Sequence, residues 1–222
     1  MQPTERAPMD RAEAFLLDQV PMAVRAKIPP TLKTAYAAAE TLIASDPILQ
    51  VQSAKNNKGR VIQWAVDLGF QRLLETGGWP FDFRWRPFER PTGRYLEIRA
   101  PYLVMTISQV EHPTIQPRDV HFRANKRLNN RGWLPFMEPE DEKEIVGLPH
   151  ALILHGYQSL NFAHLAMPEG DHGQGFVCRS PNLMLMPHEV PMAEPPMENT
   201  DIEAVMSLKE EIDKWRRDHA DE

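Results

Sequence analysis

Apolar side chains recur at helical spacing along the first third of the chain. This spacing predicts three helices, over residues 10–20, 31–45 and 57–76. In the second helix, Leu32, Tyr36 and Ala39 fall on one face. The third is apolar on more than one face, which is typical of a helix buried between other elements, and Gly77 and Gly78 follow as its stop signal.

Beyond residue 78 the period changes to an alternation of apolar and polar side chains. It predicts six strands, over residues 81–88, 94–99, 102–110, 119–125, 151–158 and 160–168. In the fourth of these, Val120, Phe122 and Ala124 alternate with polar neighbours. The short turn between the last two predicts a hairpin. Helices followed by strands indicate an α+β fold with a mainly antiparallel sheet of about six strands.

The end of the chain has a different pattern. Residues 187–199 hold four prolines and are predicted to be extended. A C-terminal helix is predicted over 201–218, where Thr200 and Glu203 form a capping box. Its apolar stripe consists of Ile202, Val205, Leu208, Ile212 and Trp215. The prediction is therefore one α+β domain over 1–186, and a proline-rich linker with an amphipathic helix over 187–222 that docks on this domain or on a protein partner.

Composition narrows the class of protein. The chain has 222 residues, of which 42% are hydrophobic and 25% charged, as in globular proteins. It has no apolar run of about 18 residues and no apolar stretch near its start, so neither a membrane span nor a secretory signal is expected. Cys178 is the single cysteine and makes no internal disulfide, which favours a reducing compartment and a cytoplasmic location.

Charge is unevenly distributed along the chain. The net charge is −6, yet residues 79–135 sum to +5 while residues 136–222 sum to −12. The basic segment includes five cations interleaved with asparagines: Arg118, Arg123, Lys126, Arg127 and Arg131. Lysine and arginine neutralise phosphates, and nearby tryptophans stack on bases or belong to the core. These five residues are the predicted nucleic-acid contacts, with a solvated polar surface as the alternative.

Two acidic residues of neighbouring strands form a second candidate site. Asp82 follows Pro80-Phe81, and Glu97 precedes Ile98-Arg99 on the next strand. Residues two apart on a strand share a face, so Glu97 and Arg99 point the same way. Two carboxylates held together bind Mg²⁺, and such an ion activates water beside a phosphate. Alternatively, Glu97 and Arg99 form the solvated face of a half-buried strand.

This pattern resembles the core of the PD-(D/E)xK nuclease family, in which a helix precedes a hairpin that carries the acids and a lysine. The resemblance covers about 25 residues and implies Asp82 and Glu97 as metal ligands and catalytic residues, with Mg²⁺ as the cofactor. Glu75, at the end of the preceding helix, is a third acid. Arg99 stands where the family has lysine; arginine stays protonated, so it holds a phosphate rather than acting as a base.

Three functions thus remain open from the sequence. The first is a nucleic-acid-binding protein, acting as a subunit of a larger assembly and using no cofactor. The second is the metal-dependent nuclease, and the third is an assembly subunit that binds only protein. A metal site formed by His121, His155 and His164 is a weaker hypothesis than ordinary core or rim positions for these side chains.

Overall fold

The computed structural model describes residues 11–88, 93–118, 120–130, 147–170 and 175–186, together with Glu210 and Lys214. The predicted proline-rich linker lies outside these residues, as does the predicted C-terminal helix apart from those two positions. Within the described part of the chain, no helix combines the length and apolar character that a membrane crossing requires.

The N-terminal part is helical, as predicted. Its helices are α1 (Arg11–Gln19), α2 (Met22–Arg25), α3 (Ile28–Ser45), α4 (Pro47–Gln50), a 3₁₀ turn (Lys55–Asn57) and α5 (Lys58–Glu75). The pattern did not predict the two four-residue helices, α2 and α4. Asp46 begins α4 by accepting a hydrogen bond from the backbone N–H of Ile48 at 2.9 Å.

A six-stranded sheet follows, in the order β1-β2-β3-β4-β5-β6. Its strands are β1 (Asp82–Pro87), β2 (Arg94–Ala100), β3 (Leu103–Val110), β4 (His150–Gly156), β5 (Ala163–Pro168) and β6 (Phe176–Arg179). All neighbours pair antiparallel except β3 and β4, which are parallel. The α+β class, the mostly antiparallel sheet and the β4–β5 hairpin are therefore confirmed, while β6 had not been predicted.

The strand predicted over 119–125 is wrong, because this segment forms helix α6 (His121–Leu128). Parallel strands need a crossover, and α6 lies in the connection between β3 and β4. The alternation of apolar and polar residues pointed to a strand because the side of α6 that faces the sheet is polar and gives no helical pattern of apolar residues. Arg123, Lys126 and Arg127 recur there at helical spacing, and their side chains bond to the sheet or its loops.

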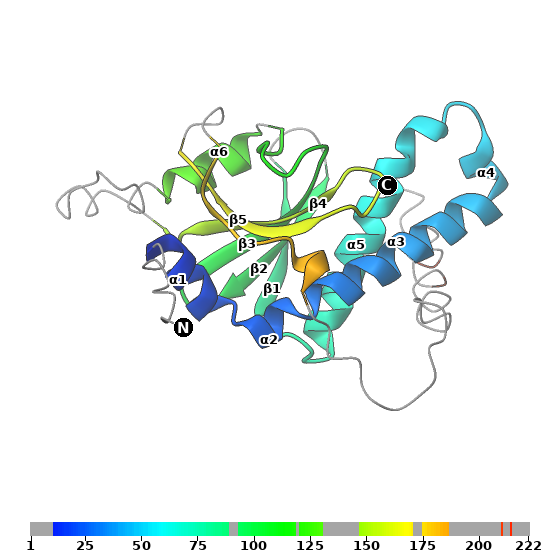
Figure 1. The fold of residues 1–222 in the computed structure, drawn as a ribbon. Coiled ribbons are helices and arrows are strands. Elements are labelled where there is room, and N and C mark those ends of the chain that lie inside the picture. Colours follow the sequence, from blue (N-terminus) through cyan, green and yellow to red (C-terminus); the bar gives the residue numbers. More distant parts are fainter. Residues whose placement is uncertain are drawn as a thin grey trace, which may run out of the picture.

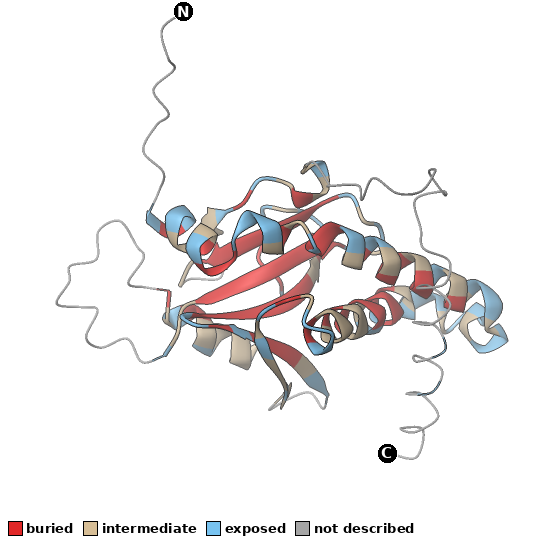
Figure 2. Cartoon of the chain, turned by 90° about the horizontal axis from the view of Figure 1, so that it is seen from below, coloured by how far each residue is buried: buried red, intermediate tan, exposed pale blue. Residues whose placement is uncertain are grey.

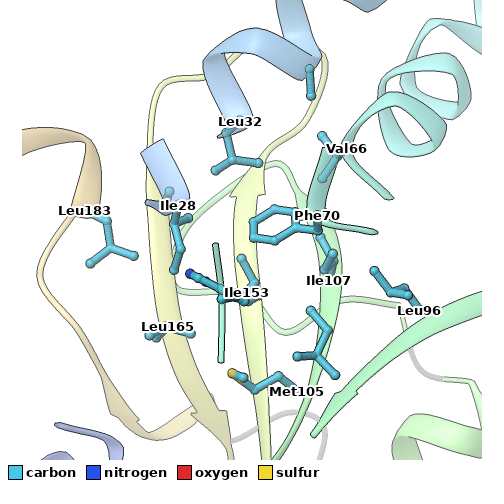
Figure 3. Packing of buried hydrophobic residues seen from close by; sticks show 14 of the residues in the cluster. Ile28, Leu32, Val66, Phe70, Leu96, Met105, Ile107, Ile153, Leu165 and Leu183 are labelled. Atoms are coloured by element: carbon cyan, nitrogen blue, oxygen red, sulfur yellow. The ribbon is translucent and has the colours of Figure 1, made fainter. Parts of the chain in front are cut away.

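The two faces of the sheet have different coverings. Figure 1 shows α6 on the opposite side of the sheet from α1 and α2. On the side of α3 and α5, strand residues such as Leu96, Met105 and Ile153 pack with Leu32 and Phe70 of the helices (Figure 3). The central strands are buried along most of their length, and the outer sides of the helices are exposed (Figure 2). Polar side chains of the strands can therefore lie on the face of the sheet that α6 covers.

The turn between α5 and β1 fixes where the first strand begins. Gly77 has φ 72°, a conformation that favours glycine and that ends the helix. Trp79 is 1% exposed, and its ring lies 5.3 Å from that of Phe70 and 5.4 Å from that of Phe81. Its indole N–H donates to the carbonyl of Val24 at 2.9 Å. The buried tryptophan therefore anchors the start of β1, the strand that forms one edge of the sheet.

Candidate nucleic-acid interface

Glu97 is the acidic centre of the α6 side of the sheet. It lies on β2 opposite Arg84 of β1 and Thr106 of β3, so these three side chains share one face. Its neighbours Leu96 and Ile98 point to the other face and belong to the hydrophobic core. Glu97 is only 2% exposed, and a buried carboxylate needs close partners to compensate for lost hydration.

Three cations provide those partners. Arg84 Nε donates to Glu97 Oε1 at 2.7 Å, and Lys126 Nζ of α6 donates to Oε2 at 2.6 Å. Arg86 Nε lies 3.5 Å from Oε1. We refer to Arg84, Arg86, Glu97 and Lys126 as the Glu97 cluster. It joins the hairpin of β1 and β2 to helix α6.

The charges of the cluster do not cancel. Burial raises the pKa of Glu97, but hydrogen bonds from Lys126 and Arg84, together with their charges, outweigh burial and lower this pKa to about 2. The carboxylate therefore stays ionised at neutral pH and supplies one negative charge against three positive ones. The side chains of Arg84 and Arg86 are 41% and 44% exposed, compared with 20% for Lys126. The surplus positive charge is thus presented to solvent on the edge strand.

A buried histidine lies near the Glu97 cluster, at the start of β4. His150 is fully buried, and its Nε2 lies 3.0 Å from the hydroxyl of Thr106. Burial and the nearby charges of Lys126 and Arg123 lower the pKa of His150 well below its ordinary value, so the ring is neutral. Asn130 holds this strand in place: its amide donates to the carbonyls of His150 and Pro168 and accepts from the N–H of His150.

Between α6 and β4 there is a cavity of about 10 Å³. Its lining includes Gln116, Arg123, Arg127, His150 and Leu152. A space of this size is close to the minimum that one water molecule occupies. The cavity is therefore a solvent pocket behind the Glu97 cluster and too small for a nucleotide.

The cations predicted from the sequence to bind nucleic acid do not all face solvent. Arg123 donates to Ser108 at 2.9 Å and to the carbonyl of Arg118 at 3.1 Å, and Arg127, 7% exposed, donates to the carbonyl of Gly170 at 3.1 Å. Arg118 is exposed, and Lys126 belongs to the Glu97 cluster. Arg131 lies outside the described residues. Among the described contacts, Arg118 thus lies at the solvent-exposed surface and Lys126 in the Glu97 cluster, whereas Arg123 and Arg127 bond to other groups of the fold.

Of the residues in the nuclease resemblance, Asp82 is exposed at the beginning of β1 and pairs with Arg99 in the strand register. This register puts Asp82, Glu97 and Arg99 on one face, as the resemblance requires. Both carboxylate oxygens of Glu97, however, accept from cations, so a metal ion would have to displace Arg84 or Lys126. Glu75 is exposed and accepts from Gln71 at 2.7 Å. The geometry thus favours Glu97 as an anchor for cations.

The histidine metal site, the weaker hypothesis from the sequence, fails on strand register. His155 pairs with Ala163, and His164 pairs with Leu154, so the two histidines point to opposite faces of the sheet. Nδ1 of His155 lies 2.7 Å from the hydroxyl of Tyr36, and Nδ1 of His164 lies 2.8 Å from the carbonyl of Ser180. Among the described residues, no group of three or more His, Cys, Asp or Glu is placed to hold a metal.

Half-buried aromatic rings border the Glu97 cluster. Tyr95, two residues before Glu97, stacks on Phe122 of α6 with ring centroids 4.1 Å apart, and Phe88 lies 5.3 Å from each. The guanidinium of Arg123 lies 5.0 Å from the centre of the Phe122 ring. These contacts fix the N-terminal turn of α6 beside the edge strand, so Lys126, one turn further along the helix, reaches Glu97.

Arg84 and Arg86 belong to the basic segment of the sequence but are not among the five contacts predicted from it. Their spacing carried a usable signal, because arginines two apart on an edge strand share a face.

The comparisons add no relative: the chain matches no protein-family model, no curated protein and no solved structure.

Proposed function

We propose that this protein binds nucleic acid through the Glu97 cluster, with Arg84 and Arg86 contacting phosphates. The observation that carries the proposal is the sharing of one buried carboxylate by three cations, two of them on half-exposed arginines. Such a surface attracts polyanions, and arginine matches phosphate geometry with its planar set of donors.

The arrangement also suits a polymer better than a single small anion. Arg84 and Arg86 are two residues apart on β1, a separation of about 7 Å along a strand. Consecutive phosphates of a nucleic acid strand are spaced similarly, so the two side chains can engage neighbouring phosphates. The exposed Arg99 lies on the same face, and Arg118 precedes α6. These contacts read the backbone and not the bases, so the expected binding depends little on sequence.

Glu97 is a positioning residue in this proposal. By accepting from Nε of Arg84, it holds that guanidinium through one of its five donors and leaves the terminal nitrogens for an incoming phosphate. A pre-positioned side chain loses less conformational entropy on binding than a free one. A role as a subunit of an assembly, with the segment 187–222 contacting a protein partner, stays a prediction from the sequence.

Fluorescence anisotropy with labelled single-stranded and double-stranded oligonucleotides tests the proposal. Arg86→Ala should weaken binding of the whole protein severalfold, because it removes one phosphate contact and leaves Glu97 with Arg84 and Lys126. Arg60→Ala is the matched control, since Arg60 is exposed on α5, which packs against the other face of the sheet. Failure of the wild-type protein to bind either oligonucleotide at low salt would overturn the proposal, as would equal losses in the two variants.

The same samples test the nuclease prediction. Cleavage that requires Mg²⁺ and disappears in Asp82→Ala would establish that activity. Binding without cleavage in the presence of Mg²⁺ would support the binding function alone.

A further inference from the structure

Three aromatic side chains continue the line of arginines on the α6 side of the sheet. Arg84 and Arg86 are two residues apart on β1, and Phe88 follows at the same interval. Tyr95 of β2 is the register partner of Arg86, so both side chains lie on this face. Phe122 of α6 stacks on Tyr95, with ring centroids 4.1 Å apart and planes inclined by 19°. We refer to Phe88, Tyr95 and Phe122 as the aromatic trio.

The aromatic trio is separate from the hydrophobic core. All three rings are half-buried, and none belongs to either of the two hydrophobic clusters formed by the described residues. The ring of Phe88 is inclined by 33° to that of Tyr95 and by 51° to that of Phe122. Gly93 leaves room for this ring, because a Cβ there would come within 3.2 Å of Phe88. The rings therefore pack on one another beside the cations and leave part of their surface to solvent.

We propose that the Glu97 cluster and the aromatic trio together select single-stranded nucleic acid. The inference rests on the proposed function and adds its substrate class: Arg84 and Arg86 hold the phosphates while unpaired bases stack on the rings. Proteins that bind single strands combine a cationic track for the backbone with aromatic side chains for the bases. In a duplex the bases are paired and stacked on one another, so their faces are closed to the rings.

The spacing of the side chains fits a nucleotide chain. Two residues of a strand span about 7 Å, and Phe88 lies one such step beyond Arg86. The phosphate and the base of one nucleotide are joined through the sugar, so a phosphate bound to Arg86 brings an unpaired base to the neighbouring ring. Every base presents a flat aromatic face, so stacking tolerates any sequence, in keeping with contacts to the backbone.

Abasic oligonucleotides test the inference without any substitution. Fluorescence anisotropy at low salt would compare three labelled ligands of equal length: single-stranded oligothymidylate, a single strand of abasic residues, and a blunt duplex. The abasic strand has the same phosphates but no bases, and the duplex has more phosphates, so charge alone favours the duplex. We expect oligothymidylate to bind roughly tenfold more tightly than the abasic strand, and also more tightly than the duplex.

The outcomes separate this inference from the proposed function. Equal affinity for oligothymidylate and the abasic strand, or tighter binding of the duplex, would overturn the selection of single strands and leave the binding of nucleic acid through Arg84 and Arg86 intact. Failure to bind any of these ligands would overturn both.

Substitutions of Phe88 test the rings as the cause. Phe88→Leu keeps an apolar side chain but removes the aromatic face, so it should reduce the preference for oligothymidylate over the abasic strand severalfold. Phe88→Trp should retain this preference. Tyr102→Leu is the matched control and should change neither affinity, since Tyr102 is 66% exposed in the turn after β2, at the opposite end of that strand from Tyr95. A Phe88→Leu protein that keeps the full preference, or that loses affinity equally for both strands, would contradict the role of the rings.

Discussion

Replacing Glu97 with glutamine is the substitution that most sharply tests the cluster. The change keeps the size of the side chain but removes the negative charge, leaving Arg84, Arg86 and Lys126 to repel one another. The pKa of Glu97 falls from 4.5 to about 2 on folding, and each unit corresponds to about 1.4 kcal/mol. The lowering is therefore equivalent to about 3 kcal/mol. Solvent screening at the half-exposed arginines reduces this stabilisation to about 2 kcal/mol.

The sign of the pH dependence follows from the lowered pKa. The unfolded chain binds the proton more tightly than the folded one, so the stabilisation by Glu97 is fully present above about pH 4.5. It is mostly lost as the pH falls to 2, where about half of the wild-type side chains are protonated and neutral, as glutamine is. The two proteins should therefore differ at neutral pH and become nearly equal in stability near pH 2.

Thermal and urea unfolding of both proteins, at pH 7 and near pH 2, provide the measurement. For a chain of this size, a loss of about 2 kcal/mol lowers Tm by about 4–8 °C. Glu111→Gln, at an exposed position after β3, is the control and should change Tm very little. The reasoning is refuted if Glu97→Gln behaves like this control at pH 7, or if its deficit persists undiminished near pH 2.

Two further predictions concern buried polar groups elsewhere in the fold. Burial raises the pKa of Asp67 on α5 from 3.8 to about 7, and a hydrogen bond from Gln63 offsets this rise only in part. Ionisation of Asp67 therefore destabilises the folded protein progressively as the pH rises from about 4 to 7. Asp67→Asn should therefore increase the free energy of unfolding above pH 7 by about 2–4 kcal/mol and lose this advantage below pH 4. The control Asp82→Asn, at an exposed site, should show neither effect in urea titrations. Asn130→Ala leaves the backbone N–H and C=O of His150 and the carbonyl of Pro168 without their amide partner, and should cost about 3 kcal/mol or more. Chemical denaturation measures that loss, and a cost below 1 kcal/mol would show that water replaces the amide.

Periodicity was a good guide wherever the buried surface is apolar. The predicted second and third helices correspond closely to α3 and α5, and five of the six predicted strands exist because Ile98, Met105, Ile153 and similar residues alternate towards one core. It failed at α6, whose buried side carries Arg123 and Arg127, since a polar buried face has no hydrophobic signature.

The Glu97 cluster was only partly accessible from the sequence. Glu97 was singled out, but its partners depend on the register of β1 against β2 and on the crossover that brings Lys126 over the sheet. Neither can be read from a single strand, because a shift of one residue moves every side chain to the other face. The roles of Asp82 and Arg99 in catalysis stay predictions.

The salt dependence of oligonucleotide binding is the sharpest test of whether Arg84 and Arg86 contact phosphates. Each phosphate contact contributes about one unit to the slope of log Kd against log salt concentration. We predict that the double variant Arg84→Ala/Arg86→Ala binds more weakly and has a slope lower by about two, while Arg60→Ala keeps the wild-type slope. Equal slopes for the wild-type protein and the double variant would show that nucleic acid, if it binds, does so elsewhere on the molecule.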